Sequence, residues 1–222
     1  MIRVAIVDDE ALVRVALRRI LESAGDIAVV VDRDGRDAVA AIEAAGPDLV
    51  LLDAVMPPPD GLTVLRELRA LPRPPVVAML TAFDTSAWIS AAMREGATGF
   101  LLKDTAVGTL IDSVRVLASG GTVFTPTVSR TVVRGYLGAG ADVGPEGADA
   151  VALGLLTSRE REVLVLMAAG RQNADIATRL GITVATVKDH VRAVLRKLDA
   201  PNRVAAAVLA HRAGLVPAAE RT

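Results

Sequence analysis

Short apolar runs alternate with amphipathic segments through the first half of the chain. The runs IRVAIV, DIAVVV, DLVLL, PVVAML and TGFLL are rich in valine, isoleucine and leucine and are bounded by turn-forming residues. Such runs are typical of buried parallel strands. Between them apolar residues recur at helical spacing, as they do after the first run at Leu12, Val15, Ala16, Ile20 and Leu21. Five strand–helix units predict an α/β fold, a doubly wound five-stranded parallel sheet with helices on both faces.

The last third of the chain shows only helical periodicity. Thr157 and Glu160 have the spacing of a capping box, which marks the start of a helix. Asn173 and Thr183 are expected to cap two further helices, and Pro201-Asn202 to open a fourth. The break between the second and third helices is short and contains a glycine, as in a helix-turn-helix. We therefore predict a small all-α domain of four helices around a helix-turn-helix.

The segment between these two regions differs from both in composition. Residues 126–137 could form one short helix. Residues 138–149 lack apolar anchors and are rich in glycine, so this segment is predicted to be a flexible tether. The expected domains are an α/β domain, a partly helical and then flexible linker, a helix-turn-helix domain and a short tail, at residues 1–122, 123–154, 155–217 and 218–222.

Charge also separates the two patterned regions. Residues 1–125 contain 12 basic and 17 acidic side chains, whereas residues 155–222 contain 11 basic and 6 acidic ones. The formal net charge of the whole chain is only −1. Two halves of opposite charge predict an acidic module joined to a module that binds nucleic acid.

The composition excludes several classes of protein. The chain has no cysteine, which excludes a disulfide framework and thiol chemistry. No apolar run approaches the roughly 20 residues that span a bilayer, and Asp8 interrupts the N-terminus before a signal-peptide core could form. We therefore expect a soluble, cytoplasmic protein without a membrane partner.

Polar residues follow the predicted strands at their C-terminal ends. Asp8 and Asp9 follow the first apolar run, Asp53 the third, Thr81 the fourth and Lys103 the fifth. The C-terminal ends of parallel strands meet at one edge of the sheet, where open α/β sheets bind ligands. Each residue alone could be a turn former, a helix cap or a solvated terminus. Together they form a set suited to phosphate and a divalent metal, in which the Lys103 ammonium and the Thr81 hydroxyl would contact phosphoryl oxygens.

Asp53 is the candidate nucleophile of this set, because a carboxylate can accept a phosphoryl group as an acyl phosphate. Carboxylates about 4 Å apart repel one another by roughly 4 kcal/mol per pair near a protein surface, so a bound cation is expected among them. Mg²⁺ is the expected cofactor. Its predicted ligands are Asp8, Asp9, Asp53 and the backbone carbonyl of Val55.

Two groups of motifs carry a family resemblance. VDDE at 7–10, LLDAVMP at 51–57, TA at 81–82 and GFLLKD at 99–104 resemble a response-regulator receiver domain, which has a flavodoxin-like fold. The later segment LTSREREVLVLMAAG…NADIATRLGITVATVKDHVRAVLRKL resembles a LuxR-type helix-turn-helix. Together they resemble the NarL/FixJ group of two-component response regulators.

The resemblance implies Mg²⁺-dependent phosphorylation of Asp53 by a partner sensor histidine kinase. It also implies a switch in which Thr81 moves toward the phosphate and Phe100 changes rotamer, although core packing is an alternative role for Phe100. One departure from the family lies beside Asp53, where Pro57-Pro58-Pro59 precede Asp60-Gly61. Because prolines fix φ and remove backbone donors, this loop is expected to be stiffer than usual.

The third helix of the C-terminal domain has a basic face. Lys188, Arg192 and Arg196 recur at i, i+4 and i+8, while another face is apolar and predicted to be buried, with Val187, Val191, Val194, Leu195 and Leu198. A basic exposed face on the second helix of a helix-turn-helix suits the major groove, although it could be a merely solvated face. The expected DNA contacts are Lys188, Arg192, Arg196, Thr186, Lys197 and Arg179.

These observations favour a transcriptional regulator that phosphorylation switches and that binds paired half-sites as a homodimer. An alternative is a constitutive DNA-binding regulator whose receiver is not phosphorylated. A phosphohydrolase with Asp53 as nucleophile is disfavoured, because Val55 lies where such enzymes carry an acid that protonates the leaving group. We therefore expect no enzymatic turnover.

Overall fold

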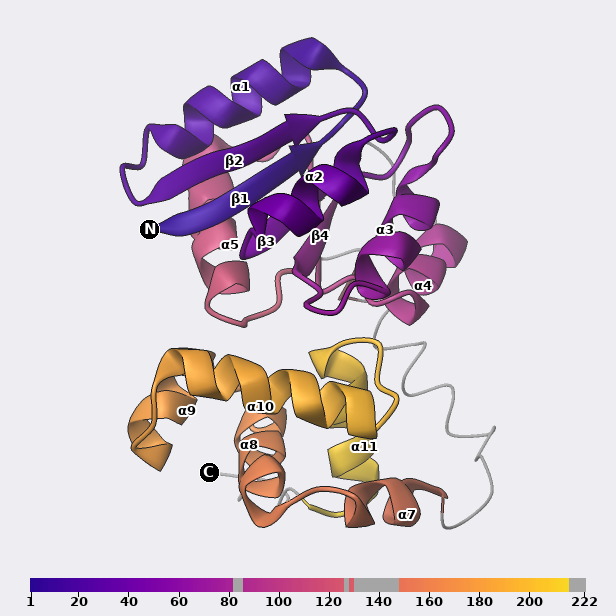
Figure 1. Ribbon diagram of the computed structural model, residues 1–222, viewed down its shortest axis with the longest axis vertical. Helices are drawn as coiled ribbons and strands as arrows, with labels where there is room; N and C mark the ends of the chain where they lie inside the picture. Colours follow the sequence, from indigo (N-terminus) through magenta and orange to yellow (C-terminus); the bar gives the residue numbers. More distant parts are fainter. Residues whose placement is uncertain (82–85, 126–127, 130–147, 216–222) are drawn as a thin grey trace. The chain divides into compact units, whose positions relative to one another are not determined.

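The computed structural model divides into two compact units, Met1–Val132 and Val133–Thr222, and each is described by itself. Most of the predicted linker helix and of the predicted tether lies outside the described residues. Within the described part, no helix is both long and apolar enough to cross a membrane. The structure describes residues 1–81, 86–125, 128–129 and 148–215 (Figure 1).

The first unit is built on a five-stranded sheet in which all paired strands are parallel. The strand order is β2-β1-β3-β4-β5, which confirms the predicted fold. Apolar residues occupy both faces of the central strands because helices cover both. The strands are β1 (Ile2–Val7), β2 (Ile27–Arg33), β3 (Leu49–Asp53), β4 (Val76–Thr81) and β5 (Gly99–Leu102).

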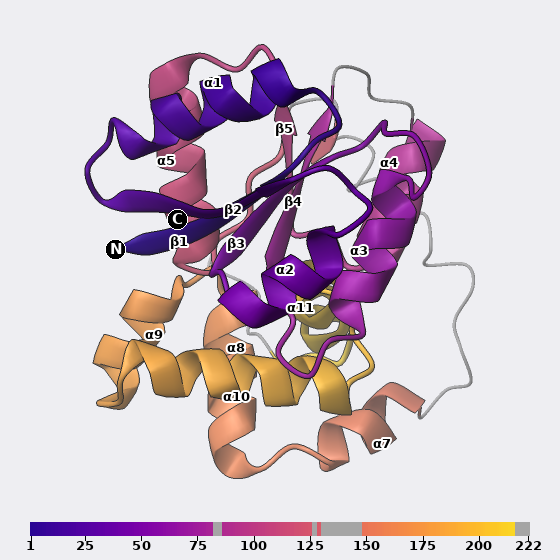
Figure 2. The same cartoon turned by 45° about the horizontal axis from the view of Figure 1, so that its top comes forward.

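Helices lie on both sides of this sheet. Figures 1 and 2 show α1 (Ala11–Glu22) and α5 (Val107–Ala118) on one face and α2 (Ala38–Ala45), α3 (Gly61–Arg69) and α4 (Ser86–Arg94) on the other. Side chains alternate between the two faces, as a period of two requires. The core under α1 and α5 contains Val4, Ile6, Leu17, Leu21, Ile27, Val29, Leu49, Leu51, Ala78, Leu80, Leu101, Leu110, Val114 and Leu117.

Helix α1 buries fewer of its apolar residues than the spacing suggested. Leu17 and Leu21 are buried, but Leu12 is 80% exposed and Val15 is 46% exposed. Val13, in the first turn of the helix, packs against the same core as Leu17 and Leu21, so Leu12 and Val15 lie on the face of the helix that is turned away from the sheet. Helical spacing alone identified the helix but not the face of it that packs against the core.

The chain after α5 returns to the edge of the sheet. Val123 forms a parallel bridge with Gly99, and its carbonyl accepts a hydrogen bond of 2.9 Å from the backbone N–H of Phe100. The ring of Phe124 lies 6.2 Å from the ring of Phe100, measured between centroids. The packing of this unit therefore continues at least through Phe124.

The second unit consists of helices around a separate apolar core. This core contains Leu153, Leu156, Val163, Leu164, Met167, Ile176, Val187, Val194 and Leu198 among its buried residues. The predicted apolar face of the third helix is thus confirmed, with Val191 and Leu195 partly buried against the same core. The helices are α7 (Ala148–Gly154), α8 (Ser158–Ala168), α9 (Asn173–Leu180), α10 (Val184–Lys197) and α11 (Arg203–Arg212).

The helix caps agree with the sequence in all but one case. Thr157 and Glu160 form the capping box of α8, and Thr183 and Asn202 cap α10 and α11 with their side chains. The predicted cap at Asn173 is wrong, because Gln172 precedes the helix and Asn173 is its first residue. The Asn173 side chain is buried instead, which places it in the packing of the domain.

Helix α7 was not predicted. Its residue Leu153 is buried in the core of the second unit, and the carbonyl of Leu153 accepts a hydrogen bond of 2.7 Å from Nη2 of Arg161. A short helix without a capping motif gives a weak sequence signal, and tertiary packing stabilises it here.

Candidate functional site

The polar residues predicted to meet at one edge of the sheet do follow neighbouring strands. Asp53 and Thr81 are the last residues of β3 and β4, while Asp8 and Lys103 directly follow β1 and β5. The strand pairing fixes their spacing, since Asp53 is in register with Leu80 of β4. The parallel register therefore places these side chains at one edge.

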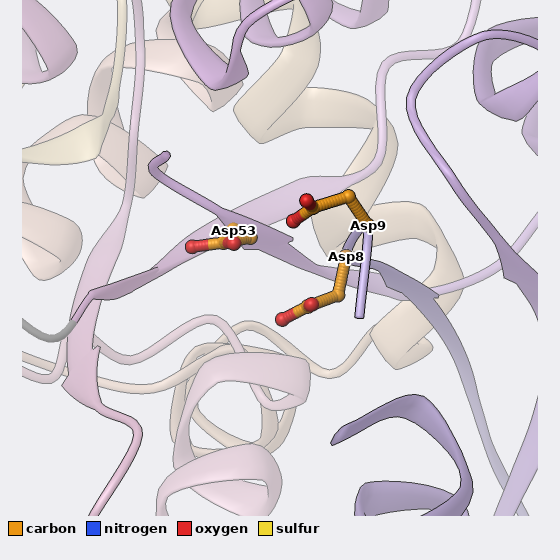
Figure 3. A group of neighbouring side chains, drawn as sticks. All are labelled: Asp8, Asp9 and Asp53. Atoms are coloured by element: carbon orange, nitrogen blue, oxygen red, sulfur yellow. The ribbon is translucent and has the colours of Figure 1, made fainter. Parts of the chain in front are cut away.

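Three carboxylates form the centre of the site. Figure 3 shows Asp8 and Asp9 together on the turn after β1 and Asp53 at the end of β3. One carboxylate oxygen from each lies within 4.8 Å of the others. Asp8 and Asp53 are buried, with 0% and 2% exposure, whereas Asp9 is exposed. The site thus has two buried acids and one acid open to solvent.

Lys103 is the cation that faces these acids. Its Nζ lies 2.9 Å from Oδ2 of Asp8 and 2.9 Å from Oδ2 of Asp53, and Oε1 of Glu10 lies at 3.7 Å. One ammonium group thus bridges the two buried carboxylates. Glu10 was not predicted as part of the site, although it belongs to the VDDE motif, and its backbone N–H also donates to Oδ1 of Asp8 at 2.9 Å.

Burial and neighbouring charges shift the pKa values of Asp53 and Lys103. Burial raises the pKa of the Asp53 carboxyl, and the hydrogen bond from Lys103 opposes this increase. Burial alone would lower the pKa of Lys103, but the adjacent Asp8 and Asp53 carboxylates outweigh it and raise the pKa to about 12. Lys103 is therefore a permanent cation at neutral pH.

The loop after Asp53 depends on a glycine that the sequence analysis did not select. Asp60 caps α3 by accepting a hydrogen bond of 2.8 Å from the N–H of Thr63, and Gly61 begins the helix. A Cβ atom at Gly61 would lie 2.3 Å from the backbone carbonyl oxygen of Asp53, so no larger residue fits without movement. The Asp60-Gly61 pair after the prolines was the available signal.

The residues of the site fit a hard divalent cation. Three carboxylates supply oxygen ligands of the kind that Mg²⁺ prefers. The single positive charge of Lys103 leaves the cluster of three acids with a net negative charge. The backbone N–H of Val55 donates to Oδ1 of Asp53 at 3.2 Å, and this turn keeps the Val55 backbone close to the phosphoacceptor candidate. Metal ligation by these four residues remains a prediction.

Phe100 and Thr81, the two predicted switch residues, are both buried. Phe100 is fully buried, and its ring meets that of Trp88 edge to face, with 6.1 Å between centroids. Thr81 is only 2% exposed, and its carbonyl accepts a hydrogen bond of 3.1 Å from the N–H of Lys103. Phe100 therefore contributes to core packing, while a switching role for both residues remains a prediction.

The second unit contains the predicted helix-turn-helix in α9 and α10. Gly181 ends α9 in the left-handed region, with φ of 63°, and allows the tight turn. On α10, Arg192 and Arg196 are exposed and Lys188 is partly exposed. Nη1 of Arg192 forms an ion pair of 2.7 Å with Asp189, one turn before it. The basic face is accessible to a ligand as predicted from its spacing.

Other predicted contact residues differ in their availability. Arg179 is exposed at the end of α9. The hydroxyl of Thr186 lies 2.8 Å from that of Thr183, within the cap of α10. Lys197 is least available, because its Nζ forms an ion pair of 2.6 Å with the buried Glu160 of α8. The structure thus gives Lys197 a role in joining α10 to α8.

Both domains of the chain are similar to known protein families. Residues 4–115 match the family model of the response regulator receiver domain, and residues 154–210 match that of the luxR family of bacterial regulatory proteins. The chain is 37% identical over 218 residues to the uncharacterized transcriptional regulatory protein YxjL of Bacillus subtilis (strain 168), covering 97% of each. It is 33% identical over 217 residues to LiaR, a transcriptional regulatory protein of the same organism, covering 97% of this chain and 100% of LiaR.

Solved structures give the same result. The response regulator ChrA of a heme-sensing two-component system matches with 35% identity and a TM-score of 0.50, over 97% of this chain and 98% of ChrA. The receiver domain of the putative response regulator NarL from Mycobacterium tuberculosis matches with 37% identity and a TM-score of 0.52, over 54% of this chain and 97% of that domain. This protein therefore belongs to the two-component response regulators of the NarL/LuxR type, transcriptional regulators in which a receiver domain precedes a LuxR-family DNA-binding domain.

Proposed function

We propose that Asp53 accepts a phosphoryl group from the phosphohistidine of a sensor kinase, and that this modification controls DNA binding by the C-terminal domain. The observation that carries the proposal is the contact of Lys103 with both buried acids, at 2.9 Å from Asp8 and from Asp53. A nucleophile, a permanent cation and a set of oxygen ligands thus lie at one edge of the sheet.

The proposed chemistry is a transfer between two side chains. A carboxylate oxygen of Asp53 attacks phosphorus, the P–N bond of the phosphohistidine breaks, and the imidazole keeps the bonding electron pair and takes up a proton. The Lys103 ammonium then pairs with a phosphoryl oxygen in place of the Asp53 carboxylate. When bound by Asp8, Asp9, Asp53 and the Val55 carbonyl, Mg²⁺ would neutralise charge on the phosphoryl oxygens.

The proposed consequence of phosphorylation is a change in the receiver surface. A phosphoryl group adds roughly 1.5–2 negative charges and attracts neighbouring donors. Lys103 already bonds to Asp53, Thr81 ends the neighbouring strand β4, and Phe100 packs against Trp88 of α4. We infer that this repacking favours a homodimer through the receiver domains, which raises the effective concentration of the second DNA-binding domain.

The proposed DNA contact is made by α10 in the major groove. Lys188, Arg192 and Arg196 form its basic face, and Arg179 and Thr186 lie near the turn. A helix-turn-helix dimer reads half-sites about 10 bp apart, centre to centre. If each monomer neutralises three or four phosphates, the slope of log K against log salt is near −6, from roughly −0.9 per phosphate.

The intact mass of the full-length protein after incubation with acetyl phosphate and Mg²⁺ tests the phosphorylation. We expect a phosphoryl adduct on the wild type and none on Asp53→Asn, which is nearly isosteric. No adduct on the wild type would favour a constitutive regulator, and rapid release of phosphate without an adduct would favour a phosphohydrolase. An equal rate of modification in the Asn variant would exclude Asp53 as the acceptor.

A further inference from the structure

Arg14 connects the acidic site to a part of the domain that the proposed chemistry does not use. Its Nη1 donates a hydrogen bond of 2.6 Å to the backbone carbonyl of Asp8. Its Nε forms an ion pair of 2.7 Å with Oδ1 of Asp32, at the end of β2. The two side chains are 18% and 20% exposed, so this bridge is largely shielded from solvent.

The bridge acts on Asp8, which is one of the predicted metal ligands. Pairing of β1 with β3 ends at Val7, directly before Asp8. The N–H of Asp8 still bonds to the Arg33 carbonyl at 3.2 Å, and its Oδ1 accepts from the N–H of Glu10 at 2.9 Å. The Arg14 guanidinium holds the remaining backbone group, the carbonyl, and so fixes the peptide plane that follows Asp8.

Arg14 is itself held in place. Asp32 also accepts a hydrogen bond of 3.2 Å from Nε of Arg18 through its other carboxylate oxygen. Nη1 of Arg18 donates to the Val29 carbonyl at 3.1 Å, which anchors this end of the network on β2. A planar guanidinium with two charged or carbonyl acceptors has little freedom to rotate. The carboxylate of Asp32 thus sets the direction in which Arg14 points.

We propose that Arg14 is a positioning residue of the phosphoacceptor site, which sets the placement of Asp8 for the divalent cation through the Asp8 carbonyl. This inference rests on the proposed function. Lys103 contacts the carboxylates of the site, whereas Arg14 bonds to the backbone carbonyl of Asp8, so this bond leaves the Asp8 carboxylate to the cation. Groups that orient metal ligands in this way typically contribute 10–100-fold in metal affinity.

Calorimetric titration of the full-length protein with Mg²⁺ tests the proposal. Arg14→Met should weaken Mg²⁺ binding at least about 10-fold. Arg14→Lys should recover part of the loss, because its ammonium can still bond to the Asp8 carbonyl. The matched control is Arg18→Met, which also removes an arginine from Asp32 but leaves the bond to Asp8, and it should stay within about twofold of the wild type.

The outcomes separate this inference from the proposed function. Wild type that binds no Mg²⁺ and gains no phosphoryl group contradicts the proposed function, and the inference fails with it. Wild type that does both, while Arg14→Met binds Mg²⁺ equally well, overturns the positioning role alone. Equal weakening in the Arg14→Met and Arg18→Met variants would indicate general loosening of α1, which also overturns it. If Arg14→Met does not fold, the lysine variant decides: weaker Mg²⁺ binding supports the proposal, and unchanged binding overturns it.

Discussion

The ion pair between Glu160 and Lys197 should stabilise the DNA-binding domain in a pH-dependent way. The pKa of Glu160 is lowered from 4.5 to about 2, mainly by the hydrogen bond from Lys197 and further by the N–H of Thr157. A lowered folded-state pKa stabilises the fold above the unfolded pKa of 4.5, and this contribution is lost as the pH falls toward 2. At pH 7 the contribution is therefore fully present.

The structure limits the size of this effect. A shift from 4.5 to about 2 corresponds to at most about 3 kcal/mol, at roughly 1.36 kcal/mol per pH unit. The Glu160 side chain is 9% exposed, but that of Lys197 is 28% exposed, so solvent screens part of the interaction. We expect Glu160→Gln to lower the free energy of unfolding by about 1–2 kcal/mol at pH 7, and by progressively less below pH 4.5.

Urea denaturation of the full-length protein measures this change. The chain has one tryptophan, Trp88, which lies in the receiver domain, so its fluorescence reports receiver unfolding, while far-UV circular dichroism reports both domains. Glu160→Gln should shift the dichroism transition of the DNA-binding domain and leave the fluorescence transition unchanged. A double-mutant cycle with Lys197→Met isolates the pair. A coupling energy below about 0.3 kcal/mol would refute the reasoning, because that value is within the additivity of independent sites.

Three further predictions concern the receiver domain and DNA. Gly61→Ala should destabilise the receiver by about 1–3 kcal/mol in the Trp88 fluorescence transition. The control Gly108→Ala, with no atom within 4 Å of the added Cβ, should not destabilise it. Equal effects of the two substitutions would exclude the predicted clash with Asp53. Arg196→Ala should reduce the salt slope of DNA binding by about 1, and an unchanged slope would exclude a phosphate contact there. Phosphorylation should tighten binding to paired half-sites about 10-fold, or 1.4 kcal/mol, with little change for single half-sites. Equal tightening of both would favour release of an inhibitory contact between domains over dimerisation.

Much of the fold was accessible from the sequence because local and global patterns agree. Five apolar runs became five buried parallel strands, and the polar residues that end these runs lie at one edge, since parallel pairing aligns strand ends. Helices α8 to α11 of the second domain were also predicted, largely from their caps, whereas α7 was not. At the start of α8, α10 and α11 a side-chain oxygen accepts a hydrogen bond from a backbone N–H of the first turn, at Thr157, Thr183 and Asn202. Such a cap involves only a few neighbouring residues, so the sequence reveals it.

Features that depend on distant partners were not accessible. Lys197 looked like a phosphate contact because nothing within its own helix reveals that Glu160 lies 2.6 Å away on α8. The Asp60-Gly61 pair indicated a turn, but the sequence did not reveal that Gly61 lies against the Asp53 carbonyl. Arg14 resembled any other arginine on an amphipathic helix, since its partners lie on β2 and on the turn after β1. In each case the tertiary arrangement determines the role.

The return of the chain to β5 has a practical consequence for work with the isolated receiver. β5 is an edge strand, and an unpaired strand edge is a template for association with another chain. The carbonyl of Val123 closes part of this edge by accepting a hydrogen bond from the N–H of Phe100. The ring of Phe124 packs against the ring of Phe100. A fragment that stops at residue 122 would lack both. Self-association of such a fragment would then report an artificially opened edge, whereas a fragment that includes Phe124 would preserve the natural one.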